Sequence, residues 1–357
     1  MKLSHLFLIC TFFFCHSLIG QDKEAFLSKL DSLGETDSVA KAQMLYNRGV
    51  SEMGTEKYNE AIELFNQAVV FNPNFAAIYL NRGLSFLEVD KKEKGMSDLV
   101  EAILLNPKLD KAYFTMGKVF EKDKEATKAI ENYSKAIELN NTESLYFYSR
   151  GVLQFQEGNY PNAKADLKKA VAIKPNYAYA WNDLGSAYLK LDQLKMAITS
   201  YEKAVKADSK LALAYNNLGS AYRRDNEYQK AVDAYSNAIA IKKDYALAYN
   251  NRGISKIKLQ QYEEAIKDFD KAIEMDEEYV YAYNNRASAY IKLEEWKKAL
   301  ADANKAVKLK KDYAYAYYNR AIAKEMVRDV KGACEDWHKS SELGLEAGET
   351  YYKSVCK

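Results

Sequence analysis

Six asparagines recur in one phase of the chain, always a multiple of 34 residues apart, and their amides could bind a peptide backbone. Each side-chain amide offers one acceptor and two donors, which suits paired hydrogen bonds to a peptide group. A row of such amides could hold an extended segment without reading its side chains. The six residues are Asn47, Asn81, Asn217, Asn251, Asn285 and Asn319.

Catalytic chemistry is poorly supported by the remaining residues. His338 is the only histidine beyond the first 20 residues, so no histidine pair or His–Cys cluster could hold a metal there. A hydrolase would have to use His338, which neighbours Trp337 and is better interpreted as a surface histidine. The chain has no glycine-rich phosphate loop and no C-x-x-C motif. We therefore expect a protein that is not an enzyme and binds no metal or cofactor.

The asparagines belong to a longer repeat that must position them. A glycine or alanine returns every 34 residues, which predicts nine copies of one supersecondary unit. A residue that small weakens a helix interior and is favoured only where two backbones approach closely. The nine residues are Gly49, Gly83, Gly117, Gly151, Gly185, Gly219, Gly253, Ala287 and Ala321.

Each repeat is predicted to be a helical hairpin. Within Ala212–Tyr245, apolar residues keep a helical period from Ala212 to Arg224 and again from Tyr228 to Ile241. Counting from Ala42 as position 1, bulky residues occupy positions 4 and 24, whereas small residues occupy positions 8, 20 and 27. Ala303 is an exception at position 24. The small positions let helices approach, and the bulky ones fill the space between them.

This pattern resembles the tetratricopeptide repeat (TPR) family, whose unit reads W-x2-L-G-x2-Y, then A-x3-F, then A and P. One departure is position 32, where proline is present only as Pro73, Pro107 and Pro175. The resemblance implies an all-α, right-handed α-solenoid in which first helices line a concave groove and each repeat contacts its neighbours. Its nine units are 42–75, 76–109, 110–143, 144–177, 178–211, 212–245, 246–279, 280–313 and 314–347.

The resemblance also implies which residues face the groove, because positions 2, 5, 6, 9, 12 and 13 do so in the family. The six asparagines, Asn47, Asn81, Asn217, Asn251, Asn285 and Asn319, are at position 6. Further polar and aromatic contacts are expected from Asn216, Asn250 and Asn284 at position 5, and from Tyr179, Tyr281 and Tyr315 at position 2. Two alternatives stay open: the position-6 asparagines bond to the backbone of a neighbouring repeat, and most tyrosines pack between helices.

Positions 7 and 23 change together, which predicts an ion pair within a repeat. Arginine at position 7 coincides with aspartate at position 23 in five units, whereas Arg48 coincides with Leu64. A guanidinium bound to a carboxylate by two hydrogen bonds suits a partly buried seam between helices. The alternative is two solvated charges in coincident phase. The predicted pairs are Arg82–Asp98, Arg150–Asp166, Arg252–Asp268, Arg286–Asp302 and Arg320–Asp336.

Residues 1–20 have the pattern of a cleaved secretory signal. Lys2 precedes an apolar run from Leu6 to Cys15, and a small residue, Gly20, precedes Gln21. The alternative is an uncleaved anchor, through which alone the chain would contact a membrane. We expect an exported protein, periplasmic or secreted.

Export leaves Cys334 and Cys356 as the two cysteines of the mature chain. An oxidising compartment favours a disulfide between them, and two free thiols near the chain end are the alternative. Both ends of the array are expected to be covered. Residues 21–41 form an amino-terminal capping segment with a helical stripe over 22–33, and residues 348–357 form a carboxy-terminal cap, with 346–355 resembling the start of a tenth unit.

Charge is balanced, with 52 basic and 50 acidic residues, so a nucleic-acid partner is not expected. Together these features predict a scaffold that binds an extended segment of a protein partner in its groove. The alternative is a structural or assembly protein that self-associates through its ends or its convex face.

Overall fold

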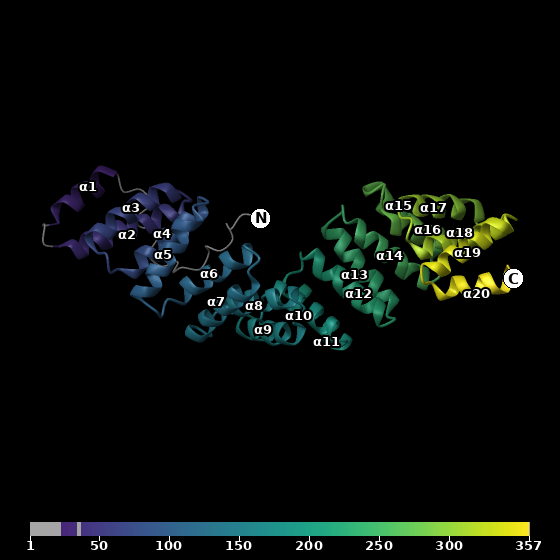
Figure 1. Ribbon diagram of the computed structural model, residues 1–357, viewed down its shortest axis with the longest axis horizontal. Helices are drawn as coiled ribbons and strands as arrows, with labels where there is room; N and C mark the ends of the chain where they lie inside the picture. The colour runs from purple at the N-terminus through teal and green to yellow at the C-terminus, as the bar shows by residue number, and fades with distance from the viewer. Residues whose placement is uncertain (1–22, 34–36, 357) are drawn as a thin grey trace. The chain divides into compact units, whose positions relative to one another are not determined.

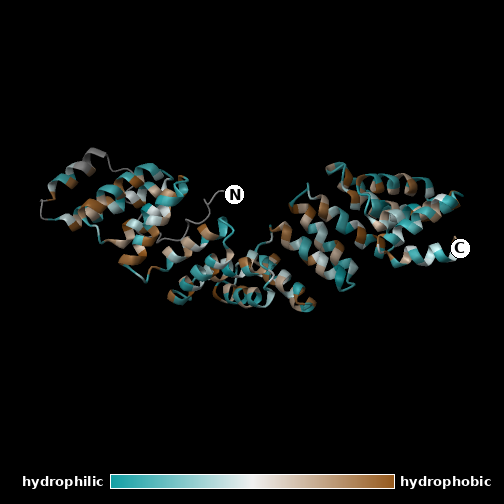
Figure 2. Ribbon diagram, in the orientation of Figure 1, coloured by the Kyte–Doolittle hydropathy of each residue, from teal (hydrophilic) through white to brown (hydrophobic). Residues whose placement is uncertain are grey.

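The computed structural model describes residues 23–33 and 37–356, and the regular elements within those ranges are all helices (Figure 1). The predicted signal, residues 1–20, lies outside the described residues. The chain divides into two compact units, Met1–Ile173 and Lys174–Lys357. In each unit, apolar and polar residues alternate along the helices (Figure 2). That pattern is typical of helices buried on one side only.

Every repeat is a pair of helices. In unit 1, α1 (Lys23–Ser32) precedes the pairs α2 (Ser38–Gly54) and α3 (Tyr58–Phe71), α4 (Ala76–Glu88) and α5 (Lys92–Leu105), α6 (Asp110–Lys122) and α7 (Ala126–Leu139), and α8 (Ser144–Gln156) and α9 (Tyr160–Ile173). In unit 2 the pairs are α10 (Ala178–Lys190) and α11 (Leu194–Ala207), α12 (Ala212–Arg224) and α13 (Tyr228–Ile241), α14 (Ala246–Lys258) and α15 (Tyr262–Met275), α16 (Val280–Lys292) and α17 (Trp296–Leu309), and α18 (Ala314–Met326) and α19 (Val330–Glu342). The last helix is α20 (Glu346–Val355).

The helix boundaries follow the 34-residue period with one difference at the start. From α4 onward, each first helix begins at the first residue of its predicted unit. Helix α2 begins at Ser38, four residues before the predicted Ala42. The reason is a cap: the Asp37 carboxylate accepts a hydrogen bond from the backbone N–H of Ala40 at 3.1 Å.

The turn inside each hairpin has one conformation throughout the array. Position 15 is left-handed in all nine repeats, with φ between 56° and 78°. Gly158 is the one glycine among these residues. The next residue donates its backbone N–H to a carbonyl oxygen of the preceding helix, as Lys57 does to Glu52 at 2.9 Å. This closure satisfies carbonyls that the helix end would otherwise leave unpaired.

Within a hairpin, position 8 is small because position 24 lies directly against it. A Cβ on Gly185 would lie 2.7 Å from the Tyr201 ring, and one on Gly253 would lie 2.6 Å from the Phe269 ring. Repeat 8 has Ala287 and Ala303 at the same two positions, both fully buried. Ala303, the exception to the bulky residues at position 24, thus leaves room for the methyl group that Ala287 adds at position 8.

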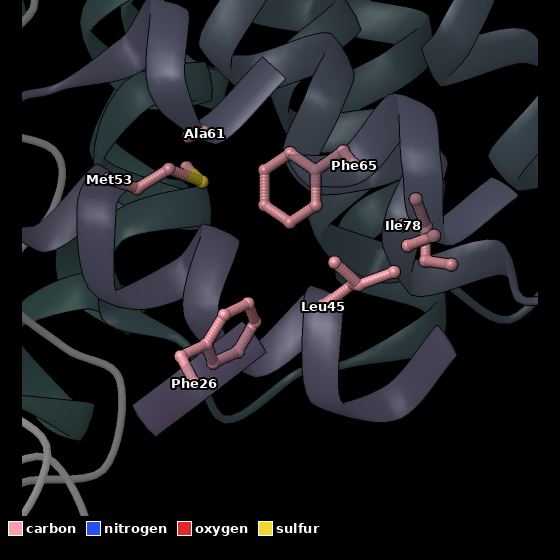
Figure 3. Packing of buried hydrophobic residues seen from close by; sticks show 7 residues of the cluster. Phe26, Leu45, Met53, Ala61, Phe65 and Ile78 are labelled. Atoms are coloured by element: carbon pink, nitrogen blue, oxygen red, sulfur yellow. The ribbon is translucent and has the colours of Figure 1, made fainter. Parts of the chain in front are cut away.

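Both ends of the array are covered as their sequences suggest. Phe26 of α1 is 9% exposed and joins Leu45, Phe65 and Ile78 in the core of the first repeat (Figure 3). At the other end, the Tyr351 ring of α20 stacks on the buried Trp337 ring with centroids 5.6 Å apart. Each terminal helix therefore removes an apolar repeat surface from water.

Candidate functional site

The asparagines of unit 2 form a ladder between repeats. The amide of each position-6 asparagine donates to the side-chain oxygen of position 5 in the preceding repeat. The four bonds are Asn217 to Asn182 at 2.9 Å, Asn251 to Asn216 at 3.2 Å, Asn285 to Asn250 at 2.9 Å, and Asn319 to Asn284 at 2.9 Å. Asn319 also donates to the backbone of the preceding repeat, at the Asn284 carbonyl 3.3 Å away, which is the alternative role expected for the position-6 asparagines. The ladder therefore joins consecutive first helices.

This arrangement corrects the prediction for position 5. Asn216, Asn250 and Asn284 are 4–5% exposed, so their side chains support the repeat interface and are not available as groove contacts. Asn319 is buried as well, at 8%, whereas Asn217, Asn251 and Asn285 stay partly exposed. Sequence reasoning also missed Asn182, which is 2% exposed and begins the ladder. Its signal was present: it occupies position 5 in phase with the other three.

In unit 1 the two predicted asparagines have different surroundings. Asn81 donates to the Tyr46 hydroxyl at 2.9 Å, which reproduces the position-6 to position-5 contact with a tyrosine as acceptor. Asn47 is exposed and accepts from Gln43 of its own helix at 2.8 Å. The regular ladder thus belongs to unit 2.

An exposed apolar row runs beside the ladder at position 2. It contains the three predicted tyrosines, and two leucines that sequence reasoning missed complete it. Leucine periodicity at position 2 could have revealed them, but an apolar residue inside a helical stripe is expected to be buried. The row and its exposed fractions are Tyr179 (51%), Leu213 (44%), Leu247 (44%), Tyr281 (44%) and Tyr315 (55%).

The five predicted Arg–Asp pairs are all present as two-point hydrogen bonds of 2.6–3.0 Å. Each arginine also donates through Nη1 to position 25 of the preceding repeat, for example Arg150 to the Ser134 hydroxyl at 2.8 Å. One guanidinium therefore joins three helices. Burial raises the pKa of Asp302, and the Arg286 guanidinium opposes that rise. Arg48 instead pairs with Glu52 of its own helix at 2.8 Å.

The repeats that lack the arginine use a buried tyrosine at position 24. The Tyr201 and Tyr235 hydroxyls lie 3.0 Å from the hydroxyls of Ser186 and Ser220. Tyr133 bonds to Glu121 in repeat 3. From repeat 2 onward each seam thus has a polar contact of one kind or the other, which explains why positions 7 and 23 change together there; repeat 1, with Leu64 and Phe65, has neither of the two.

The structure joins Cys334 to Cys356 by a disulfide with Cα atoms 5.8 Å apart.

His338 has a half-exposed side chain, packs against the Tyr352 ring and lies 3.5 Å from the Glu342 carboxylate. Among residues 23–33 and 37–356, no three His, Cys, Asp or Glu side chains group as metal ligands. Of the helices that the structure describes, none is long and apolar enough to cross a bilayer.

Unit 1 contains a pocket of about 240 Å³ between α4 and α6. Leu84, Leu87 and Val119 supply its apolar lining, and Glu88 and Lys122 are among its charged lining residues. Burial, together with Glu56 and Asp90, raises the pKa of Glu88. Apart from Lys92 at the start of α5, the lining comes from first helices and the turns after them, so neighbouring first helices leave a recess between them.

Comparison with solved structures shows the same fold. A tetratricopeptide repeat protein from Parabacteroides merdae matches with a TM-score of 0.54 at 17% identity, over 70% of this chain and 99% of that one. The C-terminal part of a TPR repeat-containing protein from Cytophaga hutchinsonii matches with a TM-score of 0.54 at 18% identity, over 66% and 98%. The APC/C hetero-tetramer Cut9–Hcn1 matches with a TM-score of 0.54 at 15% identity, over 94% and 81%.

Sequence comparison extends this result. No curated protein matches the chain. Family models described as tetratricopeptide repeat match residues 110–143, 246–279 and 280–313. A model described as TPR repeat matches residues 54–90, 153–192, 185–225 and 219–259. With helical hairpins in the same 34-residue phase, these matches show that the chain belongs to the tetratricopeptide repeat family and is a protein-interaction scaffold by fold.

Proposed function

We propose that this protein is an exported, non-enzymatic scaffold that holds an extended segment of a partner protein along the first helices of unit 2. The observation that carries the proposal is the exposed row of Tyr179, Leu213, Leu247, Tyr281 and Tyr315. Soluble proteins rarely leave such an apolar series uncovered unless it takes part in binding.

The row and the ladder share one face of each first helix. Leu247 and Asn251 on α14, like Tyr281 and Asn285 on α16, are four residues apart and therefore neighbours on the helix surface. Each repeat thus presents an apolar side chain next to an amide. Apolar side chains of a segment would cover the first, and its backbone would bond to the second.

The ladder limits how many hydrogen bonds each position-6 amide can make to a bound segment. Asn251 uses one N–H for Asn216, and its second N–H and its oxygen have no partner among the residues that the structure describes. One donor and one acceptor suit a single peptide group of an extended backbone. The proposed contact at position 6 therefore adds to the bond between repeats.

A display library of random dodecapeptides, selected against the purified protein, tests the proposal. We expect the selected peptides to slow hydrogen exchange in α10, α12, α14, α16 and α18. Substituting Leu213 and Leu247 by serine should weaken binding about tenfold, the loss expected from two half-exposed apolar contacts. The melting temperature should not fall, because both side chains are exposed. Val70→Ser, an exposed site in unit 1, is the matched control.

Selected peptides that protect only the second helices, or a library that yields no binder, would contradict the proposal.

A second candidate is self-association, which exposed apolar residues on α3 and α5 favour. Val70 and Leu104 are 78% and 70% exposed at the same repeat position, and Val100 is 45% exposed. In analytical ultracentrifugation, concentration-dependent oligomers that Leu104→Glu abolishes would support this candidate.

Export remains part of the proposal. The Cys334–Cys356 disulfide supports it, because structural disulfides are typical of oxidising compartments. Mass spectrometry of the protein isolated from its native cells tests it directly. A chain beginning at Gln21 is expected, and an intact residue 1 in a soluble cell fraction would contradict export.

A further inference from the structure

A cluster of four tyrosines and one lysine lies at the boundaries of the last three repeats. The Tyr281 ring is 6.2 Å from Tyr279 and 5.3 Å from Tyr313, and the Tyr313 ring is 6.0 Å from Tyr315. The Lys310 ammonium lies 5.6 and 5.7 Å from the Tyr281 and Tyr313 ring centroids. We call these five residues the tyrosine cluster. Tyr281 and Tyr315, its outer members, are 44% and 55% exposed.

The polar groups of the cluster are arranged as donors. Lys310 donates to the Tyr281 hydroxyl at 3.4 Å, and Asn284 donates to the Tyr313 hydroxyl at 3.4 Å. A phenol oxygen that accepts a bond keeps its own hydrogen for an outside acceptor. Burial and the neighbouring tyrosines raise the pKa of Tyr313 to about 12, so its hydroxyl stays protonated at neutral pH. The cluster therefore offers ring surfaces, hydroxyl donors and one cation.

We propose that the tyrosine cluster binds a proline-rich segment in the polyproline II conformation. Proline has no backbone N–H, so such a segment presents carbonyl acceptors without donors, and a site of donors complements it. The backbone of polyproline II makes no internal hydrogen bonds, which leaves those carbonyls available. Its carbonyl dipoles also complement the positive charge of Lys310. Aromatic side chains are the usual surface against which such segments pack.

The repeat geometry supports the same ligand. Packed helices lie about 8–10 Å apart. Polyproline II has three residues per turn and a rise of about 3.1 Å per residue, so one turn advances about 9 Å. Every third residue would therefore meet an equivalent ring on the next first helix. Tyr281 on α16 and Tyr315 on α18 are such equivalent rings, one repeat apart, and the two helices contact each other.

Preorganisation adds to this match. A polyproline II segment already has its bound conformation, so binding costs less conformational entropy than ordering a flexible chain. The inference deepens the proposed function, because it assigns a ligand class to one end of the same row.

Fluorescence anisotropy with a dye-labelled nonaproline peptide tests the proposal on the whole protein. We expect nonaproline to bind at least about tenfold more tightly than a Gly–Ser peptide of equal length, because aromatic anchors dominate such interfaces. The double variant Tyr281→Ala and Tyr315→Ala should weaken binding about tenfold. The double phenylalanine variant, which keeps the rings and removes the donors, should weaken it about threefold. Met196→Ala, which changes a 49% exposed side chain on the second helix α11 and outside the row, should have no effect.

Equal binding of the two peptides, or equal binding by the double alanine variant, would overturn the inference. Both double variants change side chains that are about half exposed, and a circular dichroism melt shows whether the fold is kept. The proposed function can survive this failure: peptides without proline that bind along α10–α18 would keep the scaffold and refute only the ligand class. Conversely, nonaproline binding that depends on Tyr281 and Tyr315 would stand even if the display library yields no other segment.

Discussion

Arg150 binds Asp166 through two parallel hydrogen bonds, 2.7 Å from Nε and 2.8 Å from Nη2. A third bond reaches Ser134 in the preceding repeat, so one guanidinium connects α7, α8 and α9. Repeat 6 has Leu218 and Ala234 in place of this pair. There the polar contact is the 3.0 Å bond between Tyr235 and Ser220. Two chemically different seams thus maintain the same hairpin.

Replacing Arg150 alone should destabilise the protein more than replacing both partners. Arg150→Leu leaves the Asp166 carboxylate, 6% exposed, without its cation, which should cost about 3 kcal/mol. The double variant Arg150→Leu, Asp166→Ala has the residues of repeat 6 at positions 7 and 23 and should cost less, because no charge is left unpaired. Urea unfolding of Arg150→Leu, Asp166→Ala and the double variant measures the difference. A double variant as unstable as the sum of the single ones would show that the charges do not interact.

Gly253→Ala should be tolerated only when Phe269 is shortened. The new Cβ would lie 2.6 Å from the Phe269 ring, and such overpacking costs about 1–3 kcal/mol. In a Phe269→Ala background the same change should be neutral or stabilise by up to about 1 kcal/mol, because alanine favours helix. A double-mutant cycle in urea measures this coupling. Gly54→Ala, whose Cβ would meet nothing within 4 Å, serves as control.

Asn251→Ala should lower the melting temperature, because it removes the donor to the buried oxygen of Asn216. An unsatisfied buried acceptor costs about 1–3 kcal/mol. Changing the exposed Leu247 of the same helix to serine should leave the melting temperature unchanged. Scanning calorimetry distinguishes the two. An unchanged melting temperature in Asn251→Ala would show that this amide does not stabilise the repeat interface and would leave partner binding as its role.

Reduction of the Cys334–Cys356 disulfide should loosen α20. The bond spans 22 residues, and closing a loop of that length contributes about 3 kcal/mol. Without it, α20 should exchange amide hydrogens faster and expose Trp337, whose fluorescence should shift to the red. The double variant Cys334→Ser, Cys356→Ser should already show both changes and ignore reductant. Fast exchange that spreads through unit 2 would instead indicate a global role for the bond.

Stability should fall at alkaline pH because of one buried tyrosine, Tyr201, and two partly buried ones, Tyr177 and Tyr313. Burial raises the pKa of Tyr177, Tyr201 and Tyr313 to about 12, whereas an unfolded tyrosine ionises near 10. Between these values the unfolded chain has lost protons that the folded chain keeps, so the free energy of unfolding decreases as pH rises. Stability from this source is complete below pH about 10 and is lost toward pH about 12. Urea midpoints measured across this range, with phenolate absorbance, check the prediction.

Parts of the site were predictable where two positions vary together. Arg150 and Asp166 carry that signal, since Leu218 and Ala234 replace them jointly in repeat 6. The third bond of each arginine has no such signal, because its acceptor changes between Asn66, Ser134 and Asp270. The sequence pattern also could not predict that Leu247 is exposed. An apolar residue on a helical stripe is buried or exposed according to what its neighbours leave open.

The helical hairpin, its 34-residue repeat and the close approach at Gly253 follow from the amino-acid sequence alone, because period and residue size are local properties of the chain. The roles of the polar residues depend instead on contacts between repeats. Asn216 and Asn251 look alike in sequence, yet one is buried between repeats and the other is partly exposed. That difference depends on how α12 approaches α14, and the distance and direction of that approach are set by packing between repeats.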